Sequence, residues 1–220
     1  LHEVFELDAG KGTLVYYSSI TTGVDGTQIG TIQKTVTVPD ITKFEFTATD
    51  FGSLTGQWYA FPGGIGDLSK MKTEDEGERY NGTILVQKPS VKLDVKLWDD
   101  NNKKPSADSV DGKTVTRNSI IAFEIEHNLG DVPEKDEFQI DIEVTTPSGG
   151  KLNKFGKVIN ESADLRKLNL TGQKVVVNET YGISLKGEDA GTYTAIAKWP
   201  SNSDFYGKGY DSNTVTFEIL

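Results

Sequence analysis

The chain has 220 residues, which exceeds the common size of a single domain, and it contains no cysteine. The lack of cysteine excludes disulfides, thiolate zinc sites and cysteine nucleophiles. A formal net charge of -10 disfavours a polyanionic partner, because nucleic-acid binding depends on clustered lysine and arginine. We therefore expect no nucleic acid as partner. We also expect no membrane insertion, since no apolar run approaches the ~18 residues that span a bilayer.

Alternation of apolar and polar residues predicts β-strands along most of the chain. This period of two occurs at residues 35–38, 44–46, 91–97, 121–125, 138–144 and 215–219. Clusters of Gly, Asp, Asn and Pro separate these runs, as in antiparallel sandwiches. We predict an all-β protein, with a short helix expected only within residues 161–170.

A short motif that occurs twice, here called the sequence echo, predicts two tandem β-sandwiches. The strings GQWYA at residues 56–60 and GTYTA at residues 191–195 are each followed by a glycine-rich loop and a closing strand. Pro89 cannot donate to a central ladder, so we place the boundary there. Residues 1–88 are then an N-terminal β-sandwich and residues 89–220 a second sandwich.

The second sandwich is predicted to be immunoglobulin-like. Tyr193 has the spacing of a tyrosine corner, in which the hydroxyl bonds back to the corner backbone. Ala195 stands where antibody domains place a cysteine. This departure leaves an immunoglobulin-like sandwich rather than a true immunoglobulin domain, and such a fold does not specify a function.

Catalytic signals are weak. The two histidines are His2, near the terminus, and His127, at a strand end, and neither has a nucleophile in sequence reach. No nucleophile elbow, zinc-binding helix or phosphate-binding loop occurs. We expect no enzyme, no catalytic residue and no cofactor. A glycosidase stays open, because it needs only two carboxylates and the chain has 33 acidic residues.

Two acidic turns offer oxygen ligands of the kind that calcium prefers. They are residues 99–102, which begin with Asp99, and residues 108–111. Neither matches a specific calcium loop, so solvated turns and a structural calcium that staples loops are both open.

The tryptophans have two readings. Trp98 and Trp199, with Trp58 and Tyr206, could form a platform on which sugars stack, or they could be core residues. The first reading makes the protein a carbohydrate-binding or adhesion module that has glycans as partners.

Four N-x-S/T sequons stand at Asn81, Asn160, Asn169 and Asn178. Sequons accept N-linked glycans on exposed surfaces of secreted proteins. Occupied sites would mark surfaces that face solvent rather than a neighbouring subunit.

Several strings in the chain resemble secreted surface proteins of methanogenic archaea. They are VDGKTV (110–115), IEVTTPSGG (142–150), AGTYTA (190–195) and GYDSNTV (209–215). Among such proteins the chain is most similar to the sheath and surface-layer type of Methanospirillum-like organisms. The resemblance implies an extracellular casing subunit without catalytic residues.

Lateral assembly of such a subunit needs a strand edge that is not blocked by Lys, Pro or a bulge. The final strand, with Thr214, Thr216 and Glu218, and the uncharged run at residues 13–17 are the candidate edges. Both could instead pair within their own domain. We expect a structural, self-assembling surface protein, extracellular by its Thr, Ser, Gly and Asn content, with a carbohydrate-binding or adhesion module as the alternative.

Overall fold

The computed structural model describes residue 5 and residues 9–24, 28–63, 67–71, 80–130 and 138–220. His2 lies outside the described residues. The chain divides into two compact units, Leu1–Lys88 and Pro89–Leu220, here called unit 1 and unit 2. The prediction of an all-β protein is confirmed, and the described helix α2 (Ala48–Phe51) has only four residues.

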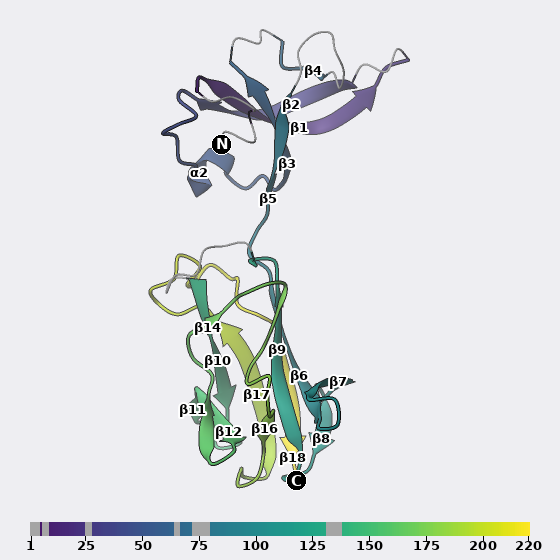
Figure 1. Ribbon diagram of the computed structural model, residues 1–220, viewed down its shortest axis with the longest axis vertical. Helices are drawn as coiled ribbons and strands as arrows, with labels where there is room; N and C mark the ends of the chain where they lie inside the picture. The colour runs from purple at the N-terminus through teal and green to yellow at the C-terminus, as the bar shows by residue number, and fades with distance from the viewer. Residues whose placement is uncertain (1–4, 6–8, 25–27, 64–66, 72–79, 131–137) are drawn as a thin grey trace. The chain divides into compact units, whose positions relative to one another are not determined.

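Unit 1 is built on one antiparallel sheet in its described residues, in the order β4-β2-β1-β3-β5 (Figure 1). Its strands are β1 (Gly12–Thr22), β2 (Gln28–Val38), β3 (Gly56–Pro62), β4 (Lys70–Met71) and β5 (Gly82–Val86). Alternate side chains point to opposite faces, so a core forms on each face. One contains Leu14, Trp58 and Ala60, and the other contains Val15 and Phe61.

The second layer over the first of these faces is irregular chain rather than strand. Phe44 and Phe46 pack against the cluster around Trp58, so the strand predicted at residues 44–46 is wrong. The physical reason lies just beyond it: the Asp50 carboxylate accepts bonds from the N–H and hydroxyl of Thr47, at 2.7 and 2.8 Å. This capping pattern starts α2 and turns the chain away from an extended path.

Unit 2 consists of two sheets. The first has the order β11-β10-β17-β18-β8, with β14 paired to β10, and the second has the order β13-β12-β16-β9-β6-β7, with β15 paired to β9. The strands are β6 (Val91–Asp99), β7 (Lys104–Ser109), β8 (Lys113–Val115), β9 (Ile120–His127), β10 (Gln139–Thr145), β11 (Lys151–Leu152), β12 (Lys154–Val158), β13 (Glu161–Asp164), β14 (Leu168–Asn169), β15 (Lys174–Val176), β16 (Ile183–Ser184), β17 (Gly191–Lys198) and β18 (Thr214–Ile219).

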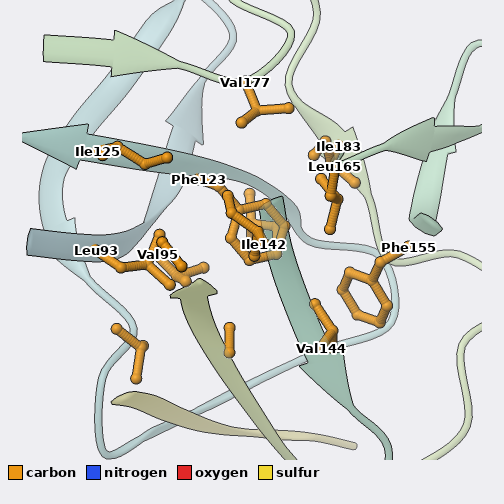
Figure 2. Packing of buried hydrophobic residues seen from close by; sticks show 14 of the residues in the cluster. Leu93, Val95, Phe123, Ile125, Ile142, Val144, Phe155, Leu165, Val177 and Ile183 are labelled. Atoms are coloured by element: carbon orange, nitrogen blue, oxygen red, sulfur yellow. The ribbon is translucent and has the colours of Figure 1, made fainter. Parts of the chain in front are cut away.

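The strand order of unit 2 is immunoglobulin-like. Strands β6, β9, β16 and β12 are neighbours in the order of strands A, B, E and D of that fold, and β10, β17 and β18 follow strands C, F and G. Figure 2 shows the core between the sheets, where Val95 and Phe123 of one sheet face Ile142 and Val144 of the other. Ala195 is fully buried in this core.

Residues 161–170 contain two strands, β13 and β14, so the short helix expected there is wrong. Strand β13 forms a hairpin with β12, in which Val158 pairs with Glu161 across a two-residue turn. The main-chain bonds of this hairpin replace those that a helix would make. After the hairpin, the backbone carbonyl of Leu165 accepts a 2.8 Å bond from the N–H of Ile142, and the N–H of Leu165 donates a 2.9 Å bond to the carbonyl of Asn153.

The two halves of the sequence echo hold equivalent places. Gly56 and Gly191 each open a strand at positive φ, 120° and 132°, where a side chain would be strained. Two residues later, Trp58 and Tyr193 are buried at 0% and 1% exposure. Strand β3 lies between β1 and β5, as β17 lies between β10 and β18. Both copies are therefore the central strand of a three-stranded antiparallel unit.

The tyrosine corner predicted from the sequence is present in unit 2. The Tyr193 hydroxyl donates a 2.9 Å hydrogen bond to the backbone carbonyl of Asp189. The ring stacks on Phe217 with centroids 5.7 Å apart. The corner thus joins the loop before β17 to the core.

We expect Tyr193→Phe to lower the free energy of unfolding of unit 2 by about 1 kcal/mol, because it removes one hydrogen bond and keeps the ring. The measurement is urea-dependent hydrogen exchange in peptides from β10 and β17. Tyr206→Phe is the matched control, since Tyr206 is 58% exposed. An equal loss in both variants would contradict the corner's role.

Candidate functional site

The final strand was one of the two candidate edges, and in the structure it is not a free edge. Strand β18 lies between β17 and β8. Glu218 pairs with Thr192 on one side and with Thr114 on the other, and the Thr114 hydroxyl lies 3.0 Å from the Glu218 carboxylate. The backbone N–H of Thr216 donates to Asp111 at 2.8 Å, while Thr214 pairs with β17. Thr216 and Glu218 are therefore covered within their own unit, because β8 returns beside them in parallel.

The outer strands of unit 2 carry features that block edge pairing. Strand β7 contains Lys104, Pro105 and Asp108. Strand β13 contains Glu161 and Asp164, and β8 and β11 have only three and two residues. Charge, proline and short length are the means by which natural sheets avoid pairing with another chain.

The outer strand β5 of unit 1 lacks these features. Strand β5 has the sequence GTILV, without charge or proline, and pairs only with β3 among the described residues. Its Leu85 is 63% exposed. Strand β2 is joined by β4 only at Gln28 and Ile29, so residues 31–38 have no outer strand partner in the described part of the chain. We call the outer sides of β5 and of residues 31–38 the open edges.

The charged side chain on the second open edge has a hydrogen-bond partner within unit 1. Residues 31–38 contain one charged side chain, Lys34, whose ammonium group donates a 3.3 Å bond to the carbonyl of Thr49, beside Asp50 of α2. Neither open edge was among the candidate edges predicted from the sequence. The sequence signal for the first is the run of residues 82–86, which contains no charge and no proline.

The uncharged run at residues 13–17 lies mainly at the centre of the unit 1 sheet, because β1 pairs with both β2 and β3 there. Beyond Val15, β1 pairs only with β2, and the two strands continue as a ribbon. Ile20, Ile29 and Ile32 on this ribbon are 38–50% exposed. Strand β4 pairs with Gln28 and Ile29, so the far end of this ribbon is three-stranded.

The tryptophans do not form an exposed stacking platform. Trp58, Trp98 and Trp199 are 0%, 8% and 2% exposed. The Trp199 indole N–H donates to the carbonyl of Tyr210 at 2.9 Å, and its ring meets Phe205 at a centroid distance of 4.7 Å. Of the four aromatic residues considered, only Tyr206 is exposed. The core reading of the tryptophans is the one that the structure supports.

Neither acidic turn forms an evident cation site. Both carboxylate oxygens of Asp99 accept protein hydrogen bonds, from the backbone of Asn101 and the backbone and side chain of Asn102, at 2.6–3.1 Å. The carboxylate of Asp111 accepts a hydrogen bond from the backbone N–H of Thr216 in β18. Within the described ranges, no group of three or more His, Asp or Glu side chains is placed to hold a metal ion.

His127 is held in a structural position. It is 8% exposed, and its Nδ1 accepts a bond of 3.2 Å from the backbone N–H of Leu129. Burial lowers the pKa of the imidazole. The ring is therefore kept neutral near pH 7.

The four sequons fall into two pairs that differ in the exposure and hydrogen bonding of the asparagine side chain. The side-chain nitrogens of Asn81 and Asn178 donate to backbone carbonyls, at 2.6 and 3.0 Å. Asn160 and Asn169 are exposed, and Asn169 uses its oxygen to accept a 2.8 Å bond from Gln139.

A charge network covers the outer face of β6, β9 and β15. The Glu124 side chain is 6% exposed, and its Oε1 lies 2.7 Å from Lys96 Nζ and 3.0 Å from Lys174 Nζ. Burial raises the pKa of this carboxyl, but the hydrogen bonds from the two lysines more than offset the burial and hold the pKa below its usual value. Its partners and its position on the sheet mark it as a structural charge rather than a general acid.

Glu124→Gln should lower the free energy of unfolding of unit 2 by about 1–3 kcal/mol at pH 7, because it removes a charged acceptor shared by two lysines. Since the folded pKa lies below the unfolded one, the stabilisation is complete above the unfolded pKa and is lost as the pH falls through the folded pKa. The difference between variant and wild type in urea unfolding should therefore shrink below about pH 4.5. A difference that is constant from pH 7 to pH 3 would contradict the charge assignment.

The comparisons with known proteins give a family. No helix in the described ranges is long and apolar enough to cross a membrane. Among curated proteins, none matches the chain. A family profile described as a domain of unknown function (DUF3821) matches residues 4–212, which cover both units. The chain therefore belongs to the DUF3821 family.

Proposed function

We propose that this protein is a non-catalytic structural subunit of an extracellular sheath or surface layer, and that copies join through strand edges of unit 1. The observation that carries the proposal is the contrast between the units. Unit 2 blocks its outer strands with charge, proline or short length, whereas β5 and residues 31–38 of β2 in unit 1 present open edges.

The chemistry of the open edges favours a second copy of the chain as partner. Each edge offers backbone N–H and C=O groups that pair with another strand at the usual spacing of about 4.8 Å. Strand β5 brings no charge into such a contact, and Lys34 of β2 already has a partner in Thr49. An added strand would also cover Leu85.

The geometry of the edges favours extended assembly. The open edges belong to two different strands on opposite sides of the β1–β3 pair, with β5 at one end of the sheet and β2 next to the two-residue strand β4 at the other. Pairing β5 of one copy with β2 of the next is therefore a head-to-tail contact, which repeats into rings or open polymers rather than stopping at a dimer. A sheath or layer needs this property, and the resemblance to archaeal surface proteins supports the same role.

The net charge should make the proposed assembly depend on ionic strength. A charge of -10 makes copies repel one another at low ionic strength. At about 0.15 M salt the Debye length falls to about 8 Å, so this repulsion is screened while the backbone contacts of an edge are kept. Assembly should therefore increase with salt.

The direct test compares Leu85→Lys with wild type by sedimentation velocity and electron microscopy at high protein concentration. Wild type should form regular polymers, while Leu85→Lys should weaken the contact at least about tenfold, or about 1.4 kcal/mol, because an edge lysine opposes pairing. Leu85 is 63% exposed, so the fold should not suffer.

The matched control is Ala107→Lys on β7, an exposed position on an edge that already contains Lys104 and Pro105. This variant should assemble as wild type does. A wild type that stays monomeric at millimolar concentration and 0.15 M salt, or an equal loss of assembly in both variants, would refute the proposal.

A further inference from the structure

The described part of unit 2 contains a groove that the proposed assembly does not use. Its volume is about 780 Å³, and its lining comes from the β12–β13 hairpin, from residues 167–169 and from residues 175–178. Among the described residues β15 pairs with β9 alone, and its Val175 and Val176 line the groove. Ile159, on the rim, is 72% exposed.

Three of the four sequons, Asn160, Asn169 and Asn178, line this groove although they come from three separate segments. The fold therefore gathers them in one place. Their side chains differ in availability, because the Asn178 nitrogen donates to the Gly182 carbonyl at 3.0 Å and Asn178 is only partly exposed. The nitrogen of Asn81, in unit 1, is likewise bound, to Phe5 at 2.6 Å.

Asn160 is the most prominent of the set. It follows Ile159 in the two-residue turn between β12 and β13, where Val158 pairs with Glu161. Ile159 has a φ of 59°, a left-handed conformation that a β-branched residue adopts at a cost. This turn holds the Asn160 side chain at the surface.

Asn169 offers its nitrogen in a different way. The residue is exposed on β14, and its oxygen accepts the 2.8 Å bond from Gln139. The amide is thereby oriented with its oxygen toward β10 and its nitrogen left for another group. Thr171 completes the sequon, as Ser162 does for Asn160.

We infer that Asn160 and Asn169 carry N-linked glycans, which cover the groove of unit 2, and that Asn81 and Asn178 do not. The co-reactant is an oligosaccharide on a lipid phosphate or diphosphate, held by a transferase. The Asn Nδ2 bonds to C1 of the first sugar and gives up one proton to a base of that enzyme. The C1–O bond breaks, and its electron pair leaves with the lipid phosphate.

The glycans would complement the assembly. Sugars on the rim would cover the exposed Ile159 and the short strand β15. This inference depends on the extracellular location in the proposed function. It does not depend on self-association, because glycan attachment needs only secretion and an accessible sequon.

The test has two parts. Glycopeptide mass spectrometry of the chain isolated from the cells that make it should find glycans at Asn160 and Asn169 and unmodified peptides at Asn81 and Asn178. Purified recombinant chain is then given to an oligosaccharyltransferase with a lipid-linked oligosaccharide, once folded and once unfolded in urea and diluted. The unfolded chain should accept at all four sequons and the folded chain only at Asn160 and Asn169.

Sequon controls keep each asparagine in place. Ser162→Ala and Thr171→Ala should abolish modification at Asn160 and Asn169 respectively, whereas Thr83→Ala should leave the folded chain's glycan mass unchanged. A bare Asn160 or Asn169 in the native chain would overturn the inference, as would a glycan at Asn81 or Asn178. Since sedimentation measures assembly separately, failure of the glycan test is distinct from failure of the assembly proposal.

Discussion

The backbone pairing of strand edges is the constraint on which this structure depends. Every strand has two rows of N–H and C=O groups, and each row must find a partner, be blocked, or remain available to another chain. In unit 2 most of these backbone groups are paired within two immunoglobulin-like sheets, and the outer strands are charged, short or contain proline. Unit 1 pairs the inner strands of one sheet and leaves β5 and residues 31–38 of β2 without an outer partner among the described residues.

The echo between the units explains where the open edge lies. Strands β3 and β17 are equivalent, and so are the closing strands β5 and β18 that pair with them. In unit 2 the closing strand is covered by β8, which Asp111 and Gly112 bring alongside through bonds to Thr216. In the described part of unit 1 no strand takes the place of β8. The outer strand of unit 1 without a covering neighbour is therefore β5, the strand equivalent to β18.

Sequence patterns predicted those features that depend on residues close together in the chain. Alternation predicted the strands β2, β6, β9, β10 and β18, and the spacing around Tyr193 predicted the corner that its hydroxyl makes with Asp189. Prediction failed where distant contacts decide. Phe44 and Phe46 alternate like strand residues but both pack on the Trp58 cluster. Alternation places Trp98 on an otherwise polar strand face, and only the fold shows that it is buried there beside Gly182. Which edge is covered depends on the order of strands in the sheets, and sequence alternation does not encode that order.

The measurement that tests the central claim most directly uses the natural lack of cysteine in the chain. Two single-cysteine variants, Thr35→Cys on the outer part of β2 and Leu85→Cys on β5, are mixed at assembling concentration and treated with a short thiol-specific cross-linker. Head-to-tail pairing predicts cross-linked dimers that contain one copy of each variant, with few dimers of either variant alone. Dimers formed only between two Leu85→Cys copies, or no cross-linked product from an assembled sample, would contradict the account.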